Sequence, residues 1–310
     1  IGNAGENVFI GGDGDDYIYG GDGLDSISYA ESQTGVTVNL ETGVVIAPAS
    51  GNDTLISIEG IVGSAFNDTL IGNAANNILD GGLGNDYLDG GDGIDTVNYS
   101  GATTTLYINL GTSAAQNVGV YGTDRLIDIE NVRAGSGDDT ILGSDGDNVI
   151  DGGGGINTIS YANAFDGVTV DLSITTAQDT DGAGTDTLIG FTHLIGSVYD
   201  DTLRGNADNN TINGGNGTDT VILSGRWVDY DITYAAGAYH LNDRRSLDGA
   251  DTYLSIEHFQ FSDQTISPLV PADMLNDAPT DLNLVYNTVL QSAPDNYLVS
   301  EIDVTDADTG

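Results

Sequence analysis

Aspartate and glycine recur along the chain with a period of nine residues, a spacing that can build oxygen-rich ion sites. The unit GGDGDDYIY at residues 11–19 is followed directly by GGDGLDSIS at residues 20–28. Thirteen such turns form four blocks, which we number 1 to 4. The turns begin at residues 2, 11 and 20 (block 1), 63, 72, 81 and 90 (block 2), 134, 143 and 152 (block 3), and 196, 205 and 214 (block 4).

The sixth position of the turns carries the candidate ligands, because it is always a carboxylate or an amide. Its residues are Asp16, Asp25, Asp68, Asp86, Asp95, Asp139, Asp201 and Asp219, with Asn7, Asn77, Asn148, Asn157 and Asn210. Hard oxygen ligands without nitrogen or sulfur favour calcium, which accepts about six to eight of them. Magnesium requires a tighter octahedron and retains water, so carbonyls of a glycine loop suit it less well. The pattern therefore indicates calcium.

Two further columns show how the ligands are positioned. The eighth position is large and apolar in every turn, as a strand residue that points into a narrow core should be. The first position is Gly except at Ala134, and we expect it to supply turn dihedrals forbidden to other residues and to let carbonyls approach a ligand. One turn plus one short strand cannot bury its apolar residue alone, so the units must stack. The chain should then return to the same edge every eighteen residues.

Charge limits the partners of this 310-residue chain. Asp and Glu total 48 against 6 Lys and Arg, which gives a net charge of −42. Such a surplus opposes compaction unless cations neutralise it. Nucleic acid and anionic membrane surfaces would be repelled. The chain has no 18-residue apolar run, so we expect no membrane insertion, and no cysteine, so it has no disulfides.

The turns resemble the G-G-x-G-x-D-x-U-x motif, in which U is large and apolar, of RTX (repeats-in-toxin, haemolysin-type) calcium-binding proteins. The resemblance extends over roughly residues 2–268 and implies an all-β fold, a right-handed parallel β-roll with Ca²⁺ between stacked turns. It implies several ions. The metal ligands that it implies are Asp16, Asp25, Asp68, Asn77, Gly81, Gly82, Gly84, Asp86, Gly91, Gly93, Asp95, Asp139, Asn157, Asp201, Gly215, Gly217 and Asp219.

The implied sites pair sixth-position residues eighteen apart. The two clearest pairs are Asp68 with Asp86 and Asp201 with Asp219, and the mixed pairs are Asn77 with Asp95, Asp139 with Asn157, and Asn7 with Asp25. A turn-capping role is the alternative for any single Asp. The fourth-position glycine is replaced by Phe66, Ala75, Tyr199 and Asp208, which predicts weaker or empty sites there.

The segments that join the blocks also repeat. Alternating strands are predicted at residues 36–40, 106–110 and 168–172, as parts of hairpins laid on the coil. The nine-residue register then places Glu59 and Glu130 at sixth positions of first turns without loops, on the same edges as Asn77 and Asn148. Calcium ligation and simple exposure remain alternatives for these two glutamates.

These patterns divide the chain into five parts. Four modules span residues 1–62, 63–133, 134–195 and 196–268, and the fourth ends in a capping segment with Trp227. Residues 269–310 read as a linker and the start of a β-sandwich that resembles a cadherin-like repeat. The chain itself reads as part of a larger polypeptide.

Catalytic motifs are missing from the sequence. There is no G-x-S-x-G, P-loop or H-E-x-x-H motif, so we expect no enzymatic activity. The resemblance implies a secreted or cell-surface protein exported by the type I secretion machinery, which folds on binding calcium outside the cell. Two classes remain open: a structural or adhesive segment of a large secreted or surface bacterial protein, or the non-catalytic C-terminal appendage of a secreted hydrolase, toxin or epimerase.

Overall fold

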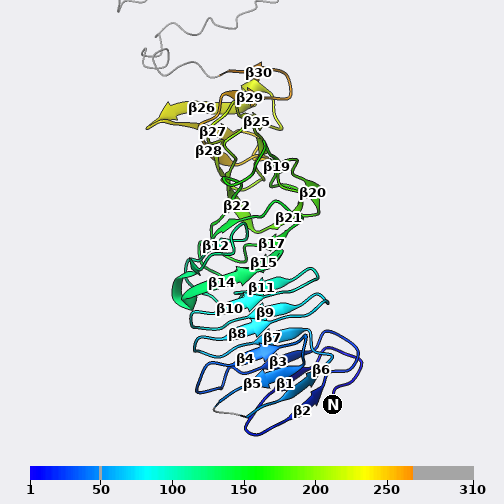
Figure 1. The fold of residues 1–310 in the computed structure, drawn as a ribbon. Helices are drawn as coiled ribbons and strands as arrows, with labels where there is room; N and C mark the ends of the chain where they lie inside the picture. The colour runs from blue at the N-terminus through cyan, green and yellow to red at the C-terminus, as the bar shows by residue number, and fades with distance from the viewer. Residues whose placement is uncertain (49–50, 268–310) are drawn as a thin grey trace, which may run out of the picture. The chain divides into compact units, whose positions relative to one another are not determined.

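The computed structural model describes residues 1–48 and 51–267 (Figure 1). Ile1–Ile266 form one compact unit, and the predicted cadherin-like segment at residues 269–310 lies outside the described residues. The regular elements of the described part are β-strands and two single 3-10 turns, η1 (Gly119–Tyr121) and η2 (Trp227–Asp229). Among these residues no helix has the length and apolar character needed to cross a membrane.

Each nonapeptide forms a turn followed by a strand of about three residues, and successive strands alternate between two walls (Figure 1). Within a block, each strand pairs in parallel with the strand eighteen residues later, so that Val8 lies opposite Ser26 and Leu70 opposite Leu88. The predicted return to the same edge every eighteen residues is thereby confirmed, and so is the parallel all-β roll.

The first wall contains two sheets, in which neighbouring strands are adjacent in space and mostly not in sequence. The first sheet runs β1 (Val8–Ile10), β3 (Ser26–Ser28), β7 (Gly60–Val62), β9 (Ile78–Asp80), β11 (Thr96–Asn98), β15 (Asn131–Arg133), β17 (Val149–Asp151), β21 (Thr185–Ile189) and β20 (Gln178–Asp179). The second runs β19 (Thr169–Asp171), β23 (Thr202–Arg204), β25 (Thr220–Ile222), β29 (His258–Gln260) and β30 (Thr265–Ile266).

The second wall also contains two sheets. The first runs β2 (Tyr17–Tyr19), β6 (Thr54–Ile56), β5 (Val44–Ile46), β4 (Thr37–Asn39), β8 (Thr69–Ile71), β10 (Tyr87–Asp89), β14 (Thr123–Ile127) and β13 (Gln116–Asn117). The second runs β12 (Tyr107–Asn109), β16 (Thr140–Leu142), β18 (Asn157–Ser160), β22 (Phe191–Ile195), β24 (Thr211–Asn213), β28 (Ala250–Leu254), β27 (Ala238–Asp243) and β26 (Tyr230–Ala235).

The strands between blocks are built into the walls and do not lie on the outside of the coil as the sequence suggested. β4 pairs in parallel with β8 on one side and antiparallel with β5 on the other. Where two sheets of one wall meet, a glutamine side chain replaces strand pairing: Gln116 makes two hydrogen bonds with the main chain of Asn109, at 2.7 and 3.0 Å. A strand inserted into the wall pairs its backbone N–H and C=O groups with the strands on both sides. A hairpin laid on the outside would leave those groups without strand partners, which explains why insertion is the observed arrangement.

The core lies between the walls and consists largely of the eighth-position residues. Twelve of the thirteen are buried, and Phe9 in the first turn is partly buried against the same core. The inserted strands contribute equivalent residues, since Val38, Ile108 and Val170 are buried in line with them. The prediction that this column points inward is confirmed.

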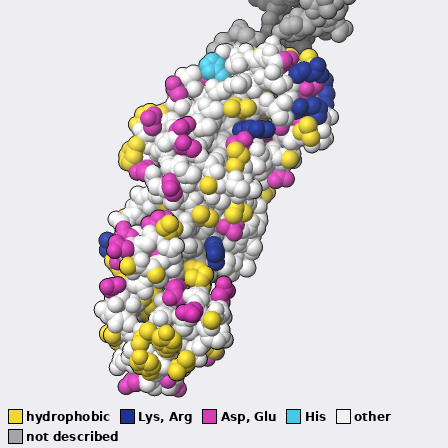
Figure 2. All heavy atoms as spheres, turned by 90° about the vertical axis from the view of Figure 1, so that its right-hand side faces the viewer, with side chains coloured by type: hydrophobic (Ala, Val, Ile, Leu, Met, Phe, Trp, Pro, Cys, Tyr) yellow, Lys and Arg dark blue, Asp and Glu magenta, His cyan; other side chains and the backbone are white. Residues whose placement is uncertain are grey.

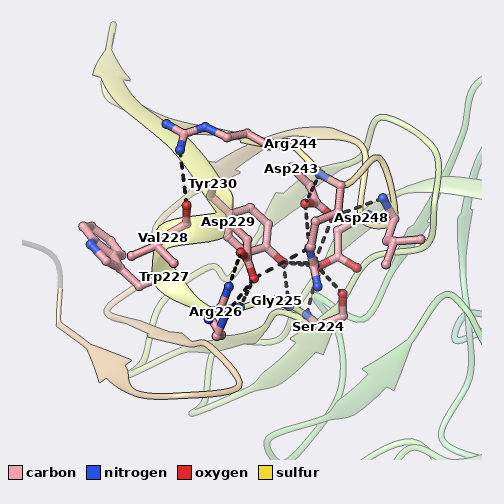
Figure 3. A network of polar contacts seen from close by, with 12 residues as sticks. Ser224, Gly225, Arg226, Trp227, Val228, Asp229, Tyr230, Asp243, Arg244 and Asp248 are labelled. Carbon is pink, nitrogen blue, oxygen red and sulfur yellow. Dashed lines mark hydrogen bonds and ion pairs between the residues drawn. The ribbon is translucent and has the colours of Figure 1, made fainter.

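The C-terminal end of the unit is an antiparallel ribbon, β26–β27–β28, that continues the second wall. Figure 3 shows a polar network that includes Tyr230 of β26 and Asp243 of β27. In this network Arg245 donates to Asp243 at 2.9 Å and to Tyr230 Oη at 3.0 Å. Burial opposes ionisation of Asp243, but hydrogen bonds from Arg245 and from main-chain amides outweigh it and lower the pKa to about 2. Arginine thus neutralises acids in this region. Figure 2 shows a cluster of arginine side chains near this end and a cluster of hydrophobic side chains at the other end.

Candidate calcium sites

The thirteen turns adopt two forms, which differ at the second residue. In the first form, the closed turn, the main-chain amide of the second residue donates to the side chain of the sixth. In block 2 the Ser64 amide donates to Asp68 Oδ2 at 2.5 Å and the Asn73 amide to Asn77 Oδ1 at 2.7 Å. Seven turns are closed, and they begin at residues 2, 63, 72, 134, 143, 196 and 205. Their sixth residues are therefore partly satisfied within the turn.

In the second form, the open turn, the second and fourth residues are glycines with positive φ. The other six turns have this form. In the turn that begins at residue 81, Gly82 has φ 79° and Gly84 has φ 147°. A Cβ on Gly82 would lie 2.0 Å from the carbonyl oxygen of Ser64 in the closed turn stacked below. Glycine at this position permits both the left-handed backbone and the close approach of two turns. The remaining open turns begin at residues 11, 20, 90, 152 and 214.

The first-position glycine has a different role from the one expected. None of the first-position glycines adopts positive φ. Glycine is needed there because a side chain would clash with the sixth-position carboxylate or amide. A Cβ on Gly81 would lie 2.4 Å from Asp86 Oδ2, and one on Gly63 would lie 2.4 Å from Asp68 Oδ2. The dihedral explanation is therefore wrong for this column and correct for Gly82, Gly84 and their equivalents.

The structure brings together all five predicted pairs of sixth-position residues. The amide of the earlier residue donates to Oδ1 of the later one, for example from Asp68 to Asp86 at 2.8 Å and from Asp201 to Asp219 at 2.9 Å. The other pairs are Asn77 with Asp95, Asp139 with Asn157, and Asn7 with Asp25. In each pair the earlier turn is closed and the later turn is open. Asp16 lies in an open turn without a paired earlier turn, and its amide donates to Asp53.

The open turns leave carboxylate oxygens without partners. Among the described residues, Oδ2 is buried without a hydrogen bond in Asp25, Asp86, Asp95 and Asp219. Burial is the main cause that raises the pKa of Asp86 to about 8 and the pKa values of Asp95 and Asp219 to about 6. A buried charge is costly unless it is paired or bound to metal. Each of these four oxygens is therefore a hard donor of the kind that fits a calcium ion.

Block 3 lacks this feature. Its open turn carries Asn157, whose Oδ1 accepts the amide of Asp139 at 2.9 Å. The Nδ2 group donates to the carbonyl oxygens of Gly154 at 3.2 Å and Gly190 at 2.9 Å. Both polar atoms of the Asn157 side chain thus have hydrogen-bond partners within the protein, whereas the aspartates of four other open turns have an unpartnered Oδ2 atom. The pair is assembled as predicted, but without the unpartnered carboxylate oxygen.

A tyrosine–aspartate pair that the sequence did not reveal ends each module. Tyr29, Tyr99 and Tyr161 donate their hydroxyls to Oδ2 of Asp53, Asp124 and Asp186 at 2.7, 2.8 and 2.7 Å. Tyr253 donates to Asp251 in the same way at 2.7 Å. These aspartates also accept the amide of the sixth-position residue in the turn on which their own turn stacks, as Asp124 does from Asp86 at 3.0 Å. The hydroxyl therefore satisfies the oxygen that is unpartnered in Asp86.

The donor sets contain few acidic side chains each. No three His, Cys, Asp or Glu side chains form a metal-binding group anywhere in residues 1–48 and 51–267. Two carboxylates at most meet between stacked turns, so main-chain carbonyls must supply the remaining oxygens. This arrangement requires a glycine-rich repeat and agrees with a known family. The chain carries four RTX calcium-binding repeat regions.

The RTX calcium-binding nonapeptide repeat model matches residues 1–30, 62–97, 120–159 and 193–224. RTX repeats bind Ca²⁺, are structural modules and are typical of secreted bacterial proteins, so several ions are expected in this chain. The comparison confirms the predicted cofactor and repeat type, and it does not extend to the predicted cadherin-like segment. No curated protein matches the chain.

Proposed function

We propose that the roll is a calcium-driven folding module of a secreted or surface protein. The observation that carries this proposal is the set of four buried, unpartnered aspartate oxygens in a chain of net charge −42. Without a cation the folded state must either protonate these groups or hold them as uncompensated charges. A calcium ion that binds only the folded state removes that penalty and stabilises the fold.

The ion in block 2 would be held by Asp68 and Asp86 together with main-chain carbonyls of the two stacked turns. The glycines at 82 and 84 serve by admitting the Ser64 and Phe66 carbonyls, since a Cβ at either position would lie within 2.5 Å of one of them. The equivalent pairs are Asn77 with Asp95, Asn7 with Asp25, and Asp201 with Asp219. Asp16 and the Asp139–Asn157 pair are weaker candidates for calcium ligands, because neither is among the residues with a buried, unpartnered carboxylate oxygen.

The free energy that calcium binding would contribute to folding is large enough to switch folding between compartments. Extracellular calcium modules have Kd values of roughly 0.1–1 mM. At about tenfold excess of calcium, one site contributes about 1.4 kcal/mol, and at cytosolic calcium this contribution vanishes. Several sites together are comparable to the whole stability of a domain. Such a chain would remain unfolded inside the cell, which suits type I secretion, and would fold outside.

A calcium titration of the full chain tests the proposal. We expect a cooperative transition from coil to β-structure in far-UV circular dichroism between sub-millimolar and millimolar calcium. Magnesium is the control and should produce little change. A chain that is fully folded in chelator would contradict metal-coupled folding.

The larger polypeptide is proposed on sequence grounds. The resemblance of residues 269–310 to a cadherin-like repeat favours a structural or adhesive protein, and the alternative is the appendage of a secreted hydrolase, toxin or epimerase. The flanking sequence discriminates between them, because further sandwich repeats support the first class and a catalytic motif supports the second.

A further inference from the structure

Three short turns at block boundaries replace the nonapeptide loop, and we call them compact acidic turns. They are residues 57–59 (Ser-Ile-Glu), 128–130 (Asp-Ile-Glu) and 255–257 (Ser-Ile-Glu). The first residue of each adopts positive φ, at 53°, 47° and 49° respectively, and the isoleucine is buried in the core. The same backbone form therefore occurs three times with a glutamate at its third position.

Each compact acidic turn stacks on the open turn of the preceding block. Oε2 of its glutamate accepts the amide of the preceding sixth-position aspartate. The distances are 2.9 Å from Asp25 to Glu59, 2.7 Å from Asp95 to Glu130 and 2.8 Å from Asp219 to Glu257. This is the bond that aspartate Oδ1 accepts between two nonapeptide turns, so the glutamate occupies a sixth position. The sequence register predicted this position for Glu59 and Glu130. On the other side, the side-chain amides of Asn77 and Asn148 donate to the main-chain carbonyl oxygens of Glu59 and Glu130, at 3.2 and 2.7 Å.

An unpartnered oxygen faces each of these turns. Asp25, Asp95 and Asp219 are fully buried, and their Oδ2 atoms have no hydrogen-bond partner in the described structure. A Cβ on Gly90 would lie 2.2 Å from the Asp128 carbonyl oxygen and 2.5 Å from Asp95 Oδ2. A Cβ on Gly214 would lie 2.3 Å from both the Ser255 carbonyl oxygen and Asp219 Oδ2. The first carbonyl oxygen of the short turn and the unpartnered carboxylate oxygen therefore border the same space, and both are hard oxygen donors of the kind that calcium binds.

The third boundary provides an internal comparison. Its short turn is residues 190–192 (Gly-Phe-Thr), so Thr192 stands where the others have glutamate. The preceding sixth residue is Asn157, which donates Nδ2 to the Gly190 carbonyl oxygen at 2.9 Å. At this boundary the aspartate and the glutamate are both replaced by uncharged residues, Asn157 and Thr192. The Nδ2 group of Asn157 takes the place of the unpartnered Oδ2 atom of the aspartates. The aspartate and the glutamate occur as a pair, as two ligands of one divalent cation would.

We propose that the compact acidic turns complete three further calcium sites, each of which shares its aspartate with a pair of nonapeptide turns. Their acidic pairs are Asp25 with Glu59, Asp95 with Glu130, and Asp219 with Glu257, and the first carbonyl of each short turn is a further ligand. The boundary between Asn157 and Thr192 holds no ion. The first two sites fasten one block to the next across the inserted strands, and the third fastens block 4 to the cap. This inference depends on the proposed function for the identity of the ion.

The test counts calcium ions bound to the full chain by equilibrium dialysis and native mass spectrometry at the lowest calcium that saturates the wild type. The variant E59Q/E130Q/E257Q keeps an oxygen to accept each amide and removes only the charges. We expect it to bind three ions fewer than the wild type. The matched control E6Q/E31Q/E41Q changes three exposed glutamates and should bind the wild-type number. A folded triple variant with the wild-type number of ions would overturn the inference.

A gain-of-site variant decides the matter if the triple variant does not fold. N157D/T192E installs the acidic pair at the third boundary, and we expect it to bind one ion more than the wild type. An unchanged number would overturn the inference. A wild-type chain that binds no calcium would refute the proposed function as well, whereas normal wild-type binding with unchanged variants would refute only these three sites.

Discussion

Blocks 2 and 3 have the same backbone plan but differ in how they satisfy their buried side chains. In both, closed turns precede open turns, and the strands continue the same first wall. Block 2 ends with Asp86 and Asp95, each with an unpartnered oxygen, whereas the open turn of block 3 ends with Asn157, whose amide group is fully bonded. A single change from carboxylate to amide thus separates a turn that needs a cation from one that does not.

Conversion of block 2 to the chemistry of block 3 should have the largest effect. In D86N/D95N the two unpartnered oxygens lose their charge, so we expect the chain to bind fewer ions and to depend less on calcium. At about tenfold calcium excess, each lost site lowers the free energy of unfolding by about 1.4 kcal/mol. Urea unfolding with calcium measures this loss, and D13N/D22N at exposed loop positions is the matched control. Unchanged unfolding of D86N/D95N would show that block 2 holds no ion there.

Protons should partly replace calcium when the ion is removed. The pKa values raised by burial, to about 8 for Asp86 and about 6 for Asp95, mean that the folded state binds more protons than the unfolded chain above about pH 4. Stability in chelator should therefore fall as pH rises from about 4 to 8. Circular dichroism in chelator at about pH 5 should show more β-structure than at pH 8. D86N/D95N should show a weaker dependence, and an equal one would refute this assignment.

Much of this comparison can be read from the sequence, because local chemistry controls the turns. The nine-residue period fixes the strands, the buried column and the eighteen-residue pairing. The distinction between open and closed turns is also visible, since the open turns have Gly-Gly where most closed turns have Gly-Ser or Gly-Asn, as at Gly63-Ser64 and Gly72-Asn73.

Contacts between distant segments could not be predicted in this way. Tyr99 reaches Asp124 across 25 residues, and nothing in either local pattern identifies the other. The insertion of β4 between β5 and β8 likewise depends on which edge is free after the coil resumes. Sequence periodicity determines neighbours along the repeat, whereas these pairings depend on the packing of whole modules.

Loss of the Tyr161 hydroxyl should create, next to block 3, a buried carboxylate oxygen without a partner, like those of Asp86 and Asp95 in block 2. Tyr161→Phe leaves Asp186 Oδ2 without its 2.7 Å hydrogen bond in a buried position. An unsatisfied buried acceptor costs about 1–3 kcal/mol. We expect the urea midpoint to fall accordingly, and the loss should shrink as calcium rises if the ion can occupy the vacated position. Tyr107→Phe is the control, because that side chain is exposed on β12. Equal midpoints for the two variants would show that the hydroxyl contributes nothing.

The smallest effect should come from an acid that arginine neutralises at the surface. Arg204 on β23 contacts Asp171 on β19 at 3.2 Å, and their side chains are 36% and 20% exposed. Solvent screens such a pair, which is worth less than about 1 kcal/mol. Arg204→Gln should therefore leave the number of bound ions unchanged and lower the urea midpoint only slightly. A loss as large as that of D86N/D95N would mean that surface pairing carries as much stability as the buried carboxylates. Burial would then not be what distinguishes block 2 from the rest of the roll.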